Sequence, residues 1–396
     1  MVPSLLLETS SQLSTIARGP ITRLRHQGTH VVLLSGRGMS SSKDHLPEVG
    51  ASPRKTPASS AGPEGTGSKP GSPWSSPRPK SKCQHHLSSH ARSRNVLQTV
   101  KTVVPKLTND LYKGQSGRIC IFGGCIMYTG APYFAAISAL KAGADLVHVI
   151  CEQQAGQVIK SYSAELIVHP VLDTEYALEE IDQWLPRFHA VVIGPGLGRN
   201  QSMLGRISII IEKVKSHNIP LVIDADGLWH LINSPGLIQG YKKAVLTPNA
   251  MEFSRLVHTV LKRGDVKPSS APDPEMVNEV SRALGGVTIV HKGSIDIISN
   301  GKHTESCVDE GCPRRCGGQG DILAGSCAVF MHWATRLKDD CPDPGAGVLA
   351  GWAACRLSRA CAAQAFSRHG RATTTTDLID QIGTAFQRLF ESETCI

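Results

Sequence analysis

The sequence predicts an α/β fold with a mainly parallel central sheet that is flanked by helices on both faces. Two observations carry this prediction. Short runs rich in Val, Ile and Leu recur at helix-sized intervals. Parallel strands that are buried on both faces have this composition and this spacing. Stretches with helical character alternate with these runs, as in β-α-β crossovers. The runs lie at residues 118–124, 145–151, 166–170, 190–196, 220–226, 243–249 and 287–293.

The remaining elements follow from the same alternation. APYFAAISALKAG (131–143) predicts a helix between the first two strands. The insert at 261–275 is interpreted as a surface loop, and no internal repeat is evident. After the seventh run the sequence predicts short strands at 296–300 and 303–308, then helices near 320–336, 346–366 and 377–391.

Residues 1–94 are predicted to form a disordered, basic tail rich in Ser, Pro and Gly, and residues 95–396 a single domain. The tail, most biased over 44–82, cannot bury enough apolar surface to offset the entropy of ordering. Residues 1–100 hold 13 Lys and Arg against 4 Asp and Glu, whereas residues 101–396 hold 29 of each. The net charge of +9 therefore belongs to the tail, and the domain has no overall bias toward nucleic acid.

The first 43 residues resemble a mitochondrial presequence, because Glu8 is their one acidic residue among several Arg and Ser. An ordinary solvated tail is the alternative, so the expected location is mitochondrial, cytoplasmic or both. HVVLLSG is too short to cross a bilayer, and no other uninterrupted apolar run has spanning length. We therefore expect a soluble protein with no membrane partner.

Polar and glycine-containing segments directly follow four of the predicted strands. Each alone could be a tight turn with a helix cap. Four in succession favour a binding site, because ligands of open α/β sheets bind beyond the carboxyl ends of the strands. The four segments are Gly194–Gly198, Asp224–Leu228, Thr247–Phe253 and His291–Gly293.

The most informative segment is Cys316-Gly-Gly-Gln-Gly-Asp321, which leads into a helix beginning at about Gly320. Glycines let the backbone approach a ligand closely, and the free N–H groups at the helix start favour an anion. Asp321 either complements the helix dipole or acts as a general base on a hydroxyl beside a bound phosphate. The sequence contains no P-loop and no G-x-G-x-x-G after its first strand, so neither P-loop nucleotide binding nor a dinucleotide-binding dehydrogenase is supported.

These residues resemble those of a known family. GGQGD at a helix start is similar to the anion-hole motif of ribokinase-like enzymes, and Asn249-Ala-Met-Glu252 to their N-x-x-E element. From about residue 95 to the C-terminus, the chain resembles the eukaryotic ATP-dependent NAD(P)H-hydrate dehydratases. Cys120 and Ala164 depart from the family pattern at positions where we expect an effect on packing rather than chemistry. The motifs in order are KGQSGRICIFGG, YTGAPYFAAISALKAGADLVHV, GPGLGR, VIDADGL, LTPNAMEFSRL, HKG and RRCGGQGDILAG.

The resemblance implies a ribokinase-like lyase that repairs nicotinamide nucleotides. Members of the family use ATP, with Mg²⁺, to phosphorylate the hydroxyl that hydration has added to the nicotinamide ring. Loss of the phosphate then returns the S epimer of hydrated NADH or NADPH to NADH or NADPH, with release of ADP and phosphate. Such an enzyme is expected to act alongside a separate NAD(P)H-hydrate epimerase. Whether it forms a homo-oligomer is left open.

Carried over residue by residue, the resemblance also assigns site residues. Asp321 is the expected catalytic base, and Asn249 and Glu252 are expected to hold Mg²⁺, partly through water. Tyr128–Gly130 resembles the family segment near the substrate. The hydrate is expected at Gly196, Asn249, Ala250, Met251, Glu252, Phe253, Ser254, Arg255 and Asp321. ATP is expected at Lys292, Gly293, Ser294, Ile295, Asp296, Gly311, Cys312, Pro313, Arg314, Arg315, Cys316, Gly317, Gly318, Gln319 and Gly320.

Two other functions have to be separated from this one. A ribokinase-like kinase of a small hydroxylated metabolite or vitamin precursor would share Asp321 and the glycines but release a stable phosphorylated product. A non-catalytic nucleotide-binding protein would be indicated by loss of Asp321 or of a glycine in 317–320, and all of these are present. Asp224 and Asp226 are expected either to orient the substrate pocket or to serve only their own turn.

Overall fold

The seven apolar runs form seven parallel strands, and two antiparallel strands extend the sheet to nine. The order across the sheet is β3-β2-β1-β4-β5-β6-β7-β8-β9. The strands follow one another from β1 toward one edge of the sheet and from β4 toward the other edge, so the strand order reverses between β1 and β4. Open α/β sheets bind ligands at such a switch point. The strands are β1 Arg118–Phe122, β2 Leu146–Cys151, β3 Ile167–Pro170, β4 Ala190–Ile193, β5 Leu221–Ile223, β6 Ala244–Leu246, β7 Thr288–His291, β8 Asp296–Ser299 and β9 Thr304–Cys307.

The computed structural model describes residues 94–264, 266–269, 271, 273–337 and 343–392. The predicted disordered tail and presequence therefore lie outside the described residues, except for residue 94, where a helical segment over 94–103 begins. The predicted surface loop at 261–275 corresponds to a connection between helices that ends at Pro274. No helix within the described ranges has both the length and the apolar character needed to cross a membrane.

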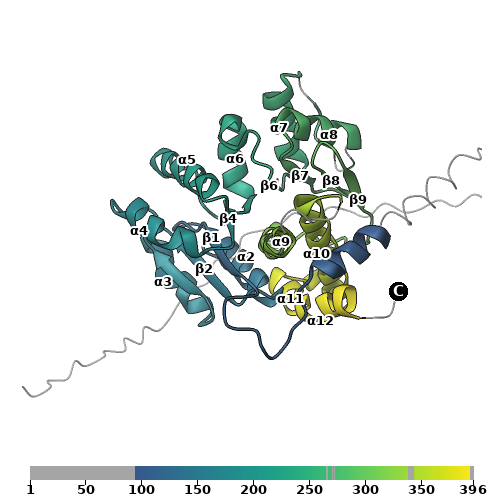
Figure 1. The fold of residues 1–396 in the computed structure, drawn as a ribbon, viewed down its shortest axis with the longest axis horizontal. Coiled ribbons are helices and arrows are strands. Elements are labelled where there is room, and N and C mark those ends of the chain that lie inside the picture. The colour runs from purple at the N-terminus through teal and green to yellow at the C-terminus, as the bar shows by residue number, and fades with distance from the viewer. Residues whose placement is uncertain (1–93, 265, 270, 272, 338–342, 393–396) are drawn as a thin grey trace, which may run out of the picture. The chain divides into compact units, whose positions relative to one another are not determined.

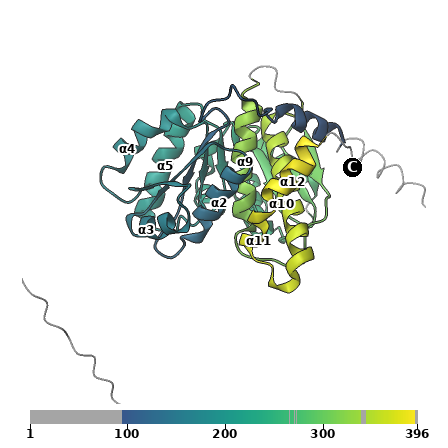
Figure 2. The same cartoon turned by 90° about the horizontal axis from the view of Figure 1, so that it is seen from below.

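Helices cover both faces of the sheet (Figure 1). One face lies under α2 Gly130–Lys141, α3 Gln153–Tyr162, α9 Gln319–Thr335, α10 Ala346–His369, α11 Thr375–Asp380 and α12 Ile382–Phe386, seen from that side in Figure 2. The other face lies under α4 Ala177–Trp184, α5 Gln201–Ser216, α6 Ala225–Asn233, α7 Ala250–Leu261 and α8 Pro274–Ala283. The predicted mainly parallel sheet between two helical layers is confirmed.

The two cores arise from the alternation of side chains along each strand. In β1, Ile119 and Ile121 are buried in the core beneath α2, α9 and α10, whereas Cys120 and Phe122 are buried in the opposite core. Helix α9 runs through the centre of the first core, where all of its residues from Asp321 to Ala334 are buried. Because packing surrounds α9, its N-terminus is held firmly at the edge of the sheet.

The predicted helix over 377–391 is wrong in detail, because this stretch forms three short pieces. Helix α11 begins earlier, at Thr375, since the Thr374 and Asp377 side chains and backbones bind one another as a capping box. It ends where the Gln381 N–H donates to the Leu378 carbonyl at 3.0 Å, three residues back. After α12, a π-helical turn closes the segment over Gln387–Glu391.

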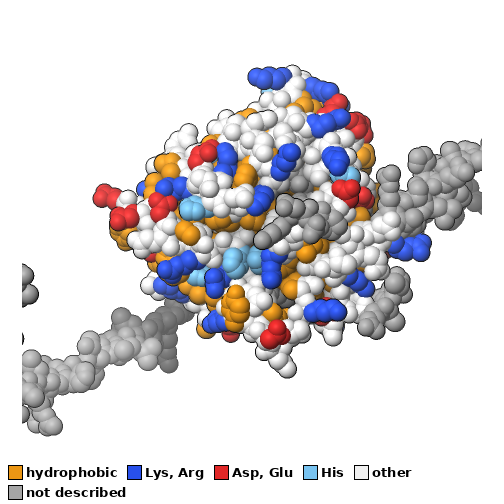
Figure 3. Space-filling view, viewed as in Figure 1, with side chains coloured by type: hydrophobic (Ala, Val, Ile, Leu, Met, Phe, Trp, Pro, Cys, Tyr) orange, Lys and Arg blue, Asp and Glu red, His pale blue; other side chains and the backbone are white. Residues whose placement is uncertain are grey.

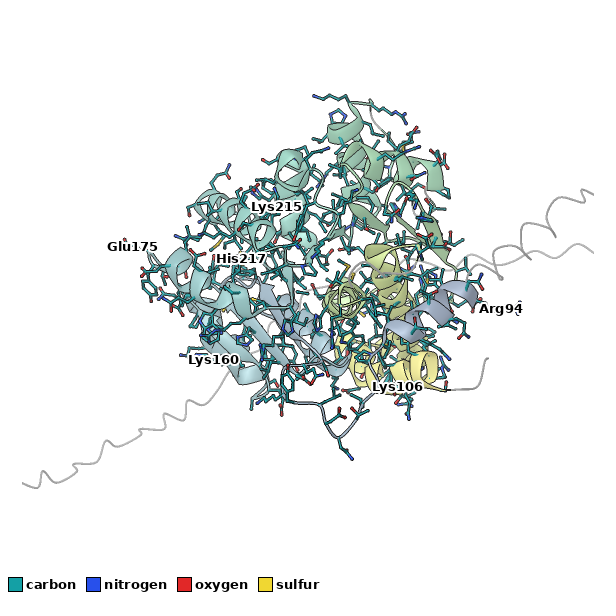
Figure 4. The ribbon with its side chains drawn as sticks, viewed as in Figure 1. Arg94, Lys106, Lys160, Glu175, Lys215 and His217 are labelled. Atoms are coloured by element: carbon teal, nitrogen blue, oxygen red, sulfur yellow. The ribbon has the colours of Figure 1, made fainter. Side chains whose placement is uncertain are left out.

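The charged side chains of the domain lie largely on its surface. In the view of Figure 3, Lys and Arg are scattered among other residue types rather than gathered into one stripe. Figure 4 shows Lys160 of α3 and Glu175 at the outer margin of the domain, and both side chains are exposed. A further group of charges, which includes Asp224 and Lys292, lies at the carboxyl edge of the sheet.

Candidate active site

Two cavities lie at the carboxyl edge of the sheet, on either side of the first turn of α6. The first, of about 720 Å³, contains Asp321 and is called the Asp321 cavity. The second, of about 820 Å³, contains Tyr128 and is called the Tyr128 cavity. Segments after β5, β6 and β7 line the first, and segments after β1, β2 and β4 line the second. The predicted position of a site at this edge matches both.

The start of α9 forms one wall of the Asp321 cavity. Gly318 precedes the helix with φ +97°, and a Cβ there would lie 2.7 Å from the Phe134 ring and 2.8 Å from Thr375. Only glycine fits this position. The first N–H groups of α9 have no partner within the helix, so they are available to an anion. Asp321, only 8% exposed, lies in that first turn.

A cluster of carboxylates around one ammonium group faces the same cavity. The Lys292 Nζ lies 2.7 Å from Asp224 Oδ1, which also accepts a hydrogen bond of 2.8 Å from the Thr247 hydroxyl. Burial opposes the charge on Lys292, but Asp224, Glu252 and Asp321 together outweigh it and raise the pKa of the ammonium group. Lys292 therefore stays charged beside the helix start, where a Cβ on Gly320 would be 3.3 Å from its Nζ.

Two carboxyl groups of this cluster, Asp321 and Glu252, hold their protons more tightly than usual. Burial, followed by the nearby Asp224, raises the pKa of Asp321 well above its ordinary value, and Lys292 opposes this only in part. Burial is also the largest cause of the raised pKa of Glu252. A carboxylate with a raised pKa is a stronger base than one in water, which suits Asp321 to accept a proton from a hydroxyl.

The predicted metal-binding pair, Asn249 and Glu252, forms the capping box of α7. Asn249 Oδ1 accepts from the N–H groups of Met251 and Glu252 at 3.0 Å, and Glu252 Oε2 accepts from the Asn249 N–H at 2.8 Å. Both residues line the Asp321 cavity. Among the described ranges, no three His, Cys, Asp or Glu side chains are grouped to hold a metal ion by themselves.

The residues predicted for the hydrate divide between several places. Asn249, Ala250, Glu252 and Asp321 line the Asp321 cavity, and Gly196 lines the Tyr128 cavity. Phe253 is buried against His291, with ring centroids 4.8 Å apart. Met251 is exposed, the Ser254 hydroxyl donates to the Val266 carbonyl, and Met251, Phe253, Ser254 and Arg255 line neither cavity.

Most of the residues predicted for ATP come together around the Asp321 cavity. Those that line it are Lys292, Gly293, Ser294, Asp296, Gly311, Cys312, Arg315, Cys316, Gly318, Gln319 and Gly320. Ile295, Pro313, Arg314 and Gly317 belong to the same two segments but are not among the lining residues. The two segments, the second of which ends in the first turn of α9, thus line one cavity.

Sequence reasoning missed the contribution of α10. Cys355, Ser358, Arg359 and Ala362 of this helix line the Asp321 cavity. The available signal was weak: Arg356 and Arg359 stand in the middle of a helix that otherwise consists largely of small apolar residues. Asp224, for which sequence left two readings, lies in the cavity at 2% exposure. Asp226 instead lines the Tyr128 cavity and pairs with Arg199 at 2.9 Å.

The site combines a buried base, a fixed ammonium group and a helix start that favours anions. Such an arrangement suits the transfer of a phosphoryl group to a hydroxyl, because positioning and electrostatic stabilisation supply most of the catalysis in that reaction. The chain has the corresponding fold. A ribokinase-like superfamily protein from Enterococcus faecalis matches it with a TM-score of 0.59 and 22% identity, covering 75% of this chain and 95% of that one.

Other comparisons agree with this fold and add the family. The Bacillus subtilis ADP/ATP-dependent NAD(P)H-hydrate dehydratase, co-crystallised with ATP and Mg²⁺, matches with a TM-score of 0.55 and 19% identity over 74% of this chain and 97% of that one. The ATP-dependent (S)-NAD(P)H-hydrate dehydratase of Mus musculus is 54% identical over 301 residues, covering 75% of this chain and 86% of that protein. Its Bos taurus counterpart is 53% identical over 311 residues, covering 78% and 93%. Since a family model described as NAD(P)H-hydrate dehydratase also matches residues 119–384, the chain belongs to the NAD(P)H-hydrate dehydratase family.

Proposed function

We propose that the protein repairs hydrated nicotinamide nucleotides. It uses ATP to convert the S epimer of hydrated NADH or NADPH back to NADH or NADPH, and it releases ADP and phosphate. Relatives 53–54% identical to the chain carry the name of this activity, which supports the proposal. The structural observation that carries it is the buried Asp321 carboxyl in the first turn of α9, beside Lys292.

In the proposed reaction Asp321 takes the proton of the ring hydroxyl. The hydroxyl oxygen bonds to the γ-phosphorus of ATP as the bond between that phosphorus and the ADP oxygen breaks. Lys292 and the N–H groups at the start of α9 stabilise the negative charge on the transferring phosphoryl group. The phosphate then leaves with the electron pair of the carbon–oxygen bond, assisted by the lone pair of the ring nitrogen. Loss of a proton from the adjacent carbon restores the double bond.

The proposal includes Mg²⁺ as a cofactor, and the donor atoms of the Asp321 cavity fit it. Mg²⁺ prefers oxygen ligands and is commonly held by one or two carboxylates together with substrate phosphates and water. Of the predicted pair, Glu252 would supply a carboxylate whose Oε2 alone is used by the capping box, and Asn249 and Asp224 line the same cavity. When bound, Mg²⁺ would neutralise part of the charge of the nucleotide phosphates.

Absorbance at 340 nm tests the function directly. Purified protein is mixed with hydrated NADH, Mg²⁺ and ATP, and we expect a rise in absorbance that requires both enzyme and nucleotide. Omission of ATP is the matched control. Consumption of ATP with a small alcohol and no rise with the hydrate would replace the dehydratase with a small-molecule kinase.

Three finer proposals concern its surroundings. Because the relatives are named for the S epimer, we propose that the enzyme acts beside a separate NAD(P)H-hydrate epimerase. With mixed epimers, repair should stop once the S epimer is consumed, until an epimerase is added.

The presequence-like composition of the N-terminus supports a mitochondrial location. Residues 1–45 fused to a fluorescent reporter should then enter mitochondria, and a diffuse signal would favour the cytoplasm. The homo-oligomer stays a prediction, which light scattering would test.

A further inference from the structure

Arg359 of α10 joins three points around the Asp321 cavity. Its Nε donates to Asp296 Oδ2 at 2.6 Å, its Nη1 to the Asp309 carbonyl at 2.9 Å and its Nη2 to the Gly293 carbonyl at 3.0 Å. The Arg359 side chain is 14% exposed and that of Asp296 is 7% exposed, so water weakens their ion pair little. One guanidinium group thus connects α10 with the β7–β8 turn and with the loop that follows β9.

The same groups fix the turn that carries Lys292. Asp296 Oδ1 accepts from the Gly293 N–H at 2.9 Å while its Oδ2 accepts from Arg359. Gly293 is therefore held through its N–H by Asp296 and through its carbonyl by Arg359. Lys292 comes directly before Gly293, and its Nζ reaches Asp224 at 2.7 Å. Holding Gly293 in place therefore sets the point from which the Lys292 side chain enters the cavity.

We propose that Arg359 is a positioning residue for ATP, which shapes the nucleotide side of the Asp321 cavity and directs Lys292 toward the transferring phosphoryl group. The inference rests on the proposed function, since it takes ATP as the occupant of this cavity. Arginine suits the role because its planar fork presents five N–H donors at fixed angles, whereas lysine offers one compact charge. Arg359 acts through Gly293, Asp296 and Lys292 rather than on the reacting atoms.

The first test is Arg359→Lys in the full-length protein. Lysine keeps a positive charge beside Asp296 but loses the fork that serves Gly293 and Asp309. Titration calorimetry with ATP and Mg²⁺ should show a Kd at least about tenfold weaker, and the KM for ATP should rise in parallel. The KM for the hydrate should stay within about twofold, because Arg359 bonds to none of the residues predicted for the hydrate. General misfolding would instead lower the active fraction without changing either KM.

Two further variants separate positioning from stability. Asp296→Asn combined with Arg359→Met removes both charges, so that no buried carboxylate is left unpaired; it should fold and still bind ATP at least about tenfold more weakly. Arg356→Met is the matched control on the same helix. Arg356 pairs with Asp309 Oδ1 at 3.1 Å and lies over the Trp352 ring, so its loss should leave the KM for ATP unchanged.

The outcomes distinguish the inference from the function. If Arg359→Lys and the double variant bind ATP as tightly as the wild-type protein, Arg359 does not position the nucleotide. The inference also fails if Arg356→Met weakens ATP binding as much as Arg359→Lys does, because the contacts to Gly293 and Asp296 would then not carry the effect. If the wild-type protein itself does not bind ATP, the proposed function is wrong and this inference falls with it.

Discussion

Replacing Asp321 with asparagine removes the proposed base while keeping the shape of the side chain. Removal of a general base costs about 10²- to 10⁴-fold in rate, so kcat should fall by that factor. The Kd of ATP should stay within about threefold or tighten, because a negative charge beside the phosphates is lost. Both quantities come from the 340 nm assay and from calorimetry on one preparation. Near-normal turnover by Asp321→Asn would show that another group takes the hydroxyl proton.

The same substitution makes a second prediction, for stability. The pKa of Asp321 is raised in the folded protein, with burial as the largest cause. Between its unfolded and folded pKa, the folded state binds more protons than the unfolded state, so stability falls as pH rises through that interval. Above the folded pKa the wild-type protein carries the full cost of a buried carboxylate, and an amide does not. Asp321→Asn should therefore be more stable at pH 8, by on the order of 1–2 kcal/mol.

Urea unfolding at several pH values measures this difference. The advantage of Asp321→Asn should be larger at pH 8 than at pH 5 and should shrink as the pH is lowered and the wild-type carboxyl takes up its proton. Wild type and variant should have equal m-values, so that the change reflects stability alone. A variant less stable than the wild type at pH 8 would show that Lys292 compensates the charge of Asp321 in full, and the argument from burial would be refuted.

The site gives three further predictions, for Asp321, Lys292 and Gly318. If Asp321 is the base, kcat/KM should decline on the acidic side at a pH above that of an ordinary carboxylate, and a plateau extending below pH 4 would contradict its raised pKa. Lys292→Met should lower kcat by about 10²-fold and destabilise the fold by about 3 kcal/mol, measured by urea unfolding, because Asp224 is left buried without its partner. Gly318→Ala should cost about 1–3 kcal/mol and weaken ATP binding, since its φ is +97° and the new methyl group meets Phe134 and Thr375; an unchanged Tm would show that the loop relaxes freely.

The strands were predictable because strands buried on both faces are nearly continuous apolar runs. The apolar runs that contain residues 190–193 and 244–246 are short and end in Gly, Pro or Asn, which favours strands, and the polar residues after parallel strands meet at one edge of the sheet. The C-terminal helices were less predictable: a capping box and a buried Gln381 interrupt a pattern whose apolar spacing continues. Local turns of the backbone set the ends of these helices, and the spacing of apolar residues does not show where such turns occur.

The grouping of the site residues was only partly predictable. A strand end fixes where a segment lies, but the direction of each side chain depends on its neighbours. Asn249 and Glu252 face the Asp321 cavity because they cap α7, whereas Phe253 in the next position turns into the core. Arg359 could not be assigned from sequence because its partners, at 293, 296 and 309, are about 50 to 66 residues away.

The first turn of α6 explains why two neighbouring aspartates belong to different cavities. Ala225 has φ +48°, a left-handed conformation that costs a non-glycine residue about 1 kcal/mol or more. The turn is held there by close packing, since a Cβ on Gly194 would lie 1.8 Å from the Asp224 carbonyl oxygen. Asp224 consequently faces Lys292, and Asp226 faces Gly198 and Arg199. Under the proposed function, ATP is expected in the Asp321 cavity, whereas Gly196, which is predicted for the hydrate, lies in the Tyr128 cavity. The strained turn at Ala225 therefore keeps Asp224 in the Asp321 cavity and Asp226 in the Tyr128 cavity, and any ligand of the one cavity meets different carboxylates from a ligand of the other.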